Sequence, residues 1–299
     1  MWFTMAVLAL LFWSGSDFFS KLGTTDGDNL SQFKVASCVG LVMGIHAFYE
    51  ILFNGVTVSL YVFWEYLPAI ACYIISMVAG YVGLRFIELS VSSPICNCSG
   101  AFVSILCLIF LHQPMDFLTA AGTILMTAGV FYLGVAESKE DDTSRAARQK
   151  IEGRHYKKTI LAILIPLFYC LLDTLGTFAD SAILEHLDED SANCAYELTW
   201  LVVGILCFLY VKVVKKEKYN LKKQTLPIFA GAICETVGQA FYVIALAENA
   251  VAAAPLICCY CAVSCIWAAI FLKERLTLRH YAALALTFAG IVVMGFVGE

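Results

Sequence analysis

Apolar residues run along this chain in long blocks that are separated by short polar turns. A helix needs about 20 mostly apolar residues to cross a bilayer, and ten blocks of the sequence approach that length. They predict an all-α membrane protein with ten transmembrane helices, near residues 2–22, 33–53, 66–86, 92–112, 116–136, 159–183, 193–213, 226–246, 251–272 and 278–297.

Composition supports this interpretation. Of 299 residues, 61% are apolar and 14% are charged, against roughly 45–50% and about 25% in a soluble domain. The mean hydropathy is +0.80, and ten apolar helices cannot share one soluble core.

The net charge of −5 forms no basic surface, so we expect a lipid bilayer and no nucleic acid as partner. Residues 1–12 lack a basic leader and a small-residue cleavage site, so the first helix is expected to be retained.

The two halves of the chain repeat each other. The segment Pro94–Cys96 recurs 161 positions later as Pro255–Ile257, and Ala128–Val130 recurs in the same register as Ala289–Ile291. Duplicated hydrophobic units are typical of transporters built from two repeats around a site at the membrane midplane. We expect Pro94 and Pro255 to open the fourth and ninth helices, where proline is tolerated in a first turn.

The repeat predicts two domains joined by a polar segment. Residues 1–136 and 157–299 would each hold five helices, and residues 137–156 would link them. Five is odd, so the second half must enter the membrane from the opposite side, which predicts inverted repeats. Lysine and arginine concentrate in the linker and between residues 212 and 223, which predicts that both lie in the cytoplasm of a cell-membrane protein with external termini.

Two stretches carry a family resemblance. Phe271–Leu278, reading F-L-K-E-R-L-T-L and followed by Ala289-Gly290, resembles the last hairpin of the drug/metabolite transporter (DMT) superfamily, EamA type. Leu11–Gly15 with Lys21 is similar to that family's first helix, although a serine separates its tryptophan from its glycine. The resemblance covers essentially the whole chain. It implies ten helices in two inverted halves and transport of a small metabolite, with members that move amino acids, amines, sugars, nucleotide conjugates or choline-like cations.

Polar side chains inside the apolar blocks are candidate functional residues, because a charge at a helix centre costs on the order of 2.5–3.5 kcal/mol. Trp13 and Asp17 are four residues apart, and Tyr169 and Asp173 repeat this spacing in the second half. Each half thus places an aromatic ring one helical turn from a carboxylate. For Asp17, an ion pair with Lys21 near the helix end is an equally good interpretation.

Glu235, Gln239 and Tyr242 share one face of the predicted eighth helix, and Asn97 lies inside the fourth. These four are further candidate substrate-binding residues. Glu235 could instead be a neutral carboxyl that joins helices, and Asn97 could hydrogen-bond a neighbouring helix. The cysteines around residues 96–98 and 258–265 do not have zinc-site spacing and are expected to be small apolar fillers, so no metal and no cofactor is predicted.

Acids beside aromatic rings favour a positively charged substrate through carboxylate attraction and cation–π contact. We expect a secondary transporter of a small cationic or zwitterionic metabolite, an amino acid or amine, that works by alternating access. Without an ATP-binding motif, a gradient or exchange would drive it, with protons as a candidate coupling ion. The alternatives are uptake of a choline-like quaternary ammonium compound and, less favoured, a membrane enzyme acting on lipid. No enzyme motif is present in the sequence, and a monomer and a homodimer are both compatible with it.

Overall fold

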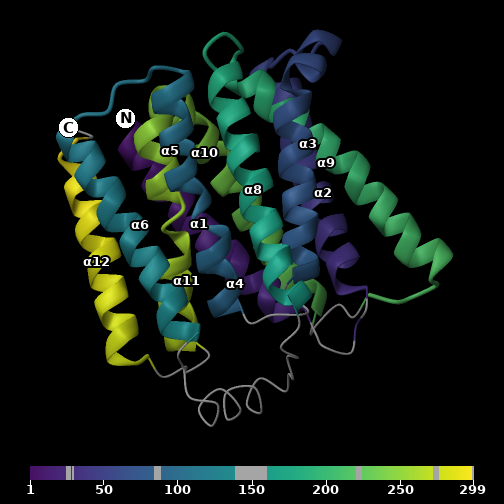
Figure 1. Ribbon diagram of the computed structural model, residues 1–299. Coiled ribbons are helices and arrows are strands. Elements are labelled where there is room, and N and C mark those ends of the chain that lie inside the picture. The colour runs from purple at the N-terminus through teal and green to yellow at the C-terminus, as the bar shows by residue number, and fades with distance from the viewer. Residues whose placement is uncertain are drawn as a thin grey trace.

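The computed structural model describes residues 1–24, 28, 30–83, 89–138, 160–219, 224–271 and 276–297. In these parts the chain is mostly helical, with no strand among the described residues, which confirms the predicted all-α class (Figure 1). In the first half the helices are α1 (Trp2–Gly23), α2 (Ser31–Tyr49), α3 (Leu60–Gly83), α4 (Leu89–Cys96), α5 (Ser99–Phe110) and α6 (Phe117–Ser138). In the second half they are α8 (Ile160–Ile183), α9 (Glu189–Leu209), α10 (Leu226–Ile257), α11 (Tyr260–Phe271) and α12 (Leu278–Gly295).

Several of these helices can cross a membrane. Among the described residues, seven helices are long and apolar enough to do so, and Pro94–Phe110 and Tyr260–Phe271 are shorter apolar segments. Large apolar side chains such as Phe53, Trp64 and Phe117 are exposed on the outside of the bundle, as a lipid-facing surface requires. The protein is therefore a multi-pass membrane protein, and the count of ten spans stays a prediction.

The fourth and ninth predicted helices are interrupted rather than continuous. Asn97 and Cys98 form a turn between α4 and α5, and Cys258 and Cys259 form the equivalent turn between α10 and α11. At both turns a hydrogen bond to the third residue back, from Cys98 to Ile95 and from Cys259 to Leu256, tightens the backbone. The two breaks are 161 residues apart, which matches the sequence repeat.

The prolines near these breaks do not lie where the sequence suggested. Pro94 lies inside α4 and Pro255 inside α10, each close to the C-terminal end of its helix. Proline cannot donate a backbone hydrogen bond to the residue four positions earlier, so it weakens the turn that contains it. The expectation that they open the helices is therefore wrong. Instead, each proline lies shortly before a helix break. Residue Asn249 has non-helical backbone angles and divides α10 into a long and a short helix.

Helix packing follows an exchange pattern between the halves. The segment α1 packs along α10, while α3 packs along α8; α2 pairs with α9, and α6 pairs with α12. If α1, α2, α3 and α6 correspond to α8, α9, α10 and α12, exchanging the halves leaves this set of contacts unchanged. In Figure 1, α6 and α12 run side by side at one edge, and both chain ends lie at the same face of the bundle, here called the terminus face. The opposite face is called the linker face.

Candidate functional site

A cavity lined by aromatic, apolar and several polar side chains lies between the two halves. Its lining comes from α1, α3, α8, α9 and α10 and from both helix breaks, and it holds about 1080 Å³ including its mouth. The lining on α1 and α3 reaches Ser20 and Tyr81, in the last turns of these helices, so the cavity extends toward the linker face.

All eight residues selected from the sequence line this one cavity. They are Trp13, Asp17, Asn97, Tyr169, Asp173, Glu235, Gln239 and Tyr242. Helices far apart in the sequence bring them together, because α1 packs on α10 and α8 packs on α3, α4 and α5. Their binding role stays a prediction, but their convergence on one space is a property of the structure.

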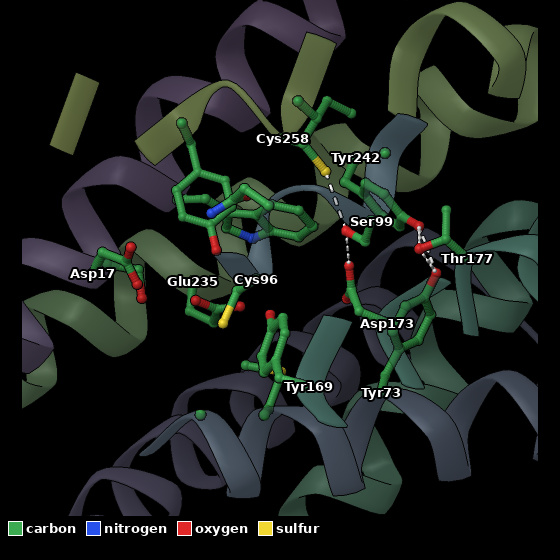
Figure 2. A pocket seen from close by; sticks show the side chains of 18 of the residues that line it. Asp17, Tyr73, Cys96, Ser99, Tyr169, Asp173, Thr177, Glu235, Tyr242 and Cys258 are labelled. Carbon is green, nitrogen blue, oxygen red and sulfur yellow. Dashed lines mark hydrogen bonds between the residues drawn. The ribbon is translucent and has the colours of Figure 1, made fainter. Parts of the chain in front are cut away.

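Asp173 projects from α8 toward the first helix break. Its carboxylate accepts a hydrogen bond from the Ser99 hydroxyl at 2.6 Å, and Ser99 Oγ lies 3.5 Å from the Cys258 thiol of the other break (Figure 2). Ser99 is the first residue of α5, so the carboxylate lies at a helix N-terminus, where the helix dipole favours negative charge. Asp173 therefore connects α8 to both breaks.

The α1–α10 contact places the remaining two acids, Asp17 and Glu235. This contact is close because glycines face it: a Cβ added to Gly238 would lie 2.5 Å from Cδ1 of Trp13. The Trp13 ring consequently lies 4.9 Å from the Tyr242 ring and 6.0 Å from the Tyr260 ring. The resulting aromatic wall adjoins the carboxylates of the same two helices.

Several donors that line the cavity have no acceptor. Trp13 Nε1, Gln239 Nε2 and Tyr81 Oη are buried and make no hydrogen bond within the described part of the chain. An indole N–H and an amide NH₂ can only donate, and a buried donor without a partner costs about 1–3 kcal/mol. The three atoms themselves are buried behind the lining surface, so the acceptor of a ligand reaches them only when these side chains move. Gln239 and Tyr242 belong to the same face of α10, so these donors border the aromatic wall.

Sequence reasoning missed several tyrosines of the site. Tyr73, Tyr196 and Tyr260 also line the cavity, and Tyr73 is hydrogen-bonded to Tyr242. Asp180, which lies behind this pair, was also missed, although it follows Asp173 by seven residues on the same face of α8. The seven-residue spacing was a detectable signal. No comparable sequence signal marked the tyrosines, because aromatic residues are common throughout these apolar helices.

The cavity between two sets of membrane helices defines a class: a multi-pass membrane protein with an internal cavity lined from both halves of the chain. Residues 159–296 match the model of the EamA-like transporter family. The second half of the chain is thus an EamA-like transporter domain, consistent with a DMT-type membrane transporter and with the resemblance noted from sequence.

Structural comparison supports the fold. One solved structure, described only as "Crystal structure of protein", is similar with a TM-score of 0.70 and 13% sequence identity, and the match covers 99% of this chain and 96% of that chain. At this identity the likeness concerns the fold and says nothing of substrate. No curated protein matches the sequence.

Proposed function

We propose that this protein is a secondary active transporter for a small cationic or zwitterionic metabolite, an amino acid or amine. The observation that carries the proposal is the convergence of Asp17, Asp173 and Glu235 on one cavity that also contains the Trp13 and Tyr242 rings. Carboxylates attract a cation, and the face of an aromatic ring does so as well. No lysine, arginine or histidine is present among the described residues that line the cavity, so an anionic substrate is disfavoured.

The unsatisfied donors favour a zwitterion over a simple cation. An α-amino acid would place its ammonium group near the acids and its carboxylate near Trp13 Nε1 and Gln239 Nε2. A choline-like ion, the second candidate, would use the aromatic wall but could not accept hydrogen bonds through its quaternary nitrogen. A lipid-modifying enzyme is a weaker candidate, since the site is an internal cavity lined from both halves of the chain.

The helix arrangement supports alternating access. The exchange-symmetric contacts are those expected from two inverted five-helix halves, residues 1–136 and 157–299, and interrupted helices facing the site are common in such transporters. We propose that the halves rock around the cavity, with protons as the coupling ion. We place the protein in the cell membrane, as a monomer or a homodimer.

Transport by purified protein in liposomes tests this function. Vesicles loaded with L-alanine, L-lysine or choline would be mixed with the same labelled compound outside, and exchange would be followed with time. A carrier gives saturable uptake that internal substrate accelerates, and Asp173→Asn should reduce that uptake at least tenfold while leaving the elution profile in detergent unchanged. Glu65→Gln, at an exposed carboxylate outside the cavity, is the matched control. Absence of exchange for all three compounds would contradict the proposed substrate class, and undiminished exchange by Asp173→Asn would contradict the proposed site.

A further inference from the structure

Asp180 is a buried carboxylate behind the cavity. Its side chain is fully buried and does not line the cavity. Tyr66 donates a hydrogen bond to Oδ1 at 2.6 Å, and Tyr73 donates one to Oδ2 at 2.9 Å. Both tyrosines lie on α3, seven residues apart, so they share one helix face toward α8. In the described part of the chain Asp180 makes no ion pair, which is costly for an ionised group inside a membrane.

A chain of hydroxyl groups joins Asp180 to the cavity. Tyr73 Oη is hydrogen-bonded to Tyr242 Oη at 2.5 Å, and Thr177 Oγ1 lies 3.2 Å from Tyr73 Oη and 3.3 Å from Tyr242 Oη (Figure 2). Tyr73, Thr177 and Tyr242 all line the cavity. The carboxylate is therefore one phenol group, that of Tyr73, away from the cavity lining, and Tyr73 in turn contacts the Tyr242 hydroxyl.

The direction of this chain depends on the protonation of Asp180. Each tyrosine hydroxyl has one proton to donate. When Asp180 is ionised, Tyr73 donates to it and Tyr242 can donate to Tyr73, which leaves the lone pairs of Tyr242 free to accept from a ligand. When Asp180 is protonated, it can donate to Tyr73, which then donates to Tyr242. Tyr242 is then left with its own proton to donate toward the cavity or Thr177.

The location of Asp180 separates it from the three acids of the cavity. It lies three residues before the end of α8 at Ile183, and Tyr66 lies in the second turn of α3. Both positions are near the terminus face, while the cavity lining extends toward the linker face at Ser20 and Tyr81. Asp180 therefore lies on the side of the cavity that is nearer the terminus face.

We propose that Asp180 is the binding site of the coupling proton and that the Tyr73–Tyr242 hydroxyl pair transmits its protonation state to the substrate. This inference rests on the proposed transport function. The titratable groups near Asp180 on the packed helices are Tyr66 and Tyr73 of α3, Tyr242 of α10, and Tyr196 of α9, which lies edge-on to Tyr73. Cys107 of α5 lies beside Ser181, and the nearest acids along the chain are Asp173 and Glu185. Tyrosine and cysteine side chains ordinarily stay protonated at neutral pH, whereas a carboxyl group ordinarily ionises, so Asp180 is the acid of this cluster.

The first test measures the pH dependence of ligand affinity. Binding of L-alanine to the purified full-length protein would be titrated calorimetrically between pH 5 and 8, in the wild type, Asp180→Asn and Tyr73→Phe. If ligand binding is coupled to the uptake or release of one proton, the affinity changes about tenfold per pH unit. Both variants should lose this pH dependence. Tyr73→Phe keeps the carboxylate and removes one hydroxyl, so it preserves the test if Asp180→Asn does not fold. Tyr132→Phe, at an exposed tyrosine of α6, should keep the wild-type slope. A wild-type slope in Asp180→Asn or in Tyr73→Phe would overturn the proposal.

The second test does not depend on the substrate. Infrared difference spectra recorded across the same pH range detect the C=O stretch of a protonated carboxyl. Asp180→Asn should remove one such band, Tyr73→Phe should shift it, and Glu235→Gln should leave it in place. If the wild type binds and transports none of the probes, the proposed function fails while this result still decides whether Asp180 takes up a proton. An unchanged set of bands in Asp180→Asn overturns the inference.

Discussion

At the scale of single residues, the cavity contains complementary polar groups. Carboxylates on α1, α8 and α10 can hold a positive charge, and donor groups beside the aromatic wall can hold an acceptor. The candidate acids were predictable because a charged residue stands out in an apolar helix. Whether each donor has a hydrogen-bond partner was not predictable, because that depends on neighbours that other helices supply.

Gln239 should distinguish a zwitterionic substrate from a quaternary ammonium ion. We expect Gln239→Leu to weaken L-alanine binding about ten- to a hundredfold, because a hydrogen bond to a charged group contributes about 1.5–3 kcal/mol. Choline binding should change less than twofold, because its quaternary nitrogen accepts no hydrogen bond. Calorimetric titration of both compounds gives the ratio. Equal losses for the two ligands would show that Gln239 does not contact the substrate carboxylate.

Asp28, in the connection between α1 and α2, should stabilise the linker face in a pH-dependent way. Burial raises its pKa, but hydrogen bonds from Lys34, Gln224 and the Leu30 amide outweigh this, so the pKa lies below its ordinary value. A lowered folded-state pKa stabilises the protein above the unfolded-state pKa of about 4, and the stabilisation is lost as the pH falls through the folded value.

Asp28→Asn should therefore lower the melting temperature by a constant amount between about pH 5 and 7, and the difference from wild type should shrink below about pH 4. Thermal unfolding in detergent at several pH values measures it. Because Gln224 precedes α10, the same contact also connects the two halves of the chain. A difference that grows toward acid pH would contradict this assignment.

At the scale of helices, equivalent positions in the two halves have the same structural role, here the capping of a helix N-terminus. Asp116 accepts a hydrogen bond from the Thr119 amide at the start of α6, and Thr277 forms a capping box with His280 at the start of α12. These caps are 161 residues apart, as the sequence repeat requires. That backbone hydrogen bond is the largest influence on the Asp116 carboxyl and holds its pKa below the ordinary value.

The α6–α12 pair should depend on two glycines in equivalent positions. A Cβ added to Gly290 would lie 2.7 Å from the Met126 backbone nitrogen, and one added to Gly129 would lie 2.6 Å from the Thr287 backbone nitrogen. Backbone atoms cannot move away as a side chain can. We expect Gly290→Val to destabilise the protein by about 1–3 kcal/mol through overpacking.

The neighbouring exposed position provides the control for this substitution. Ala289→Val adds similar bulk to the outward face of α12 and should leave the melting temperature almost unchanged. Thermal unfolding of both variants in the same detergent compares them. If Gly290→Val is as stable as Ala289→Val, the two helices are not in close contact in the folded protein.

At the scale of the whole molecule, the orientation in the membrane is a direct prediction. Positive charge in residues 137–156 and 212–223 predicts that these segments are cytoplasmic. On a cysteine-free background, a single cysteine at Ser144 should resist an impermeant maleimide in intact cells, whereas one at Asn54, between α2 and α3, should react. Asn54 is exposed. Efficient labelling at Ser144 with protection at Asn54 would reverse the orientation.

The sequence by itself determined the class of this protein, its apolar segments and its internal repeat. These follow from local properties: a membrane helix satisfies its own backbone hydrogen bonds, so length and hydropathy identify it without knowledge of its neighbours. The acids in the middle of such helices were identifiable for the same reason. The 161-residue register also placed the two prolines in equivalent positions.

Only the tertiary structure decided how these segments act together. It placed Asp17, Asp173 and Glu235 around one cavity, showed that both prolines precede helix breaks, and put Tyr66 and Tyr73 against Asp180, more than one hundred positions away in the sequence. Hydrogen bonds between side chains of different helices depend on which faces pack together. That choice follows from the shape of the whole bundle, in which small residues such as Gly238 allow close approach.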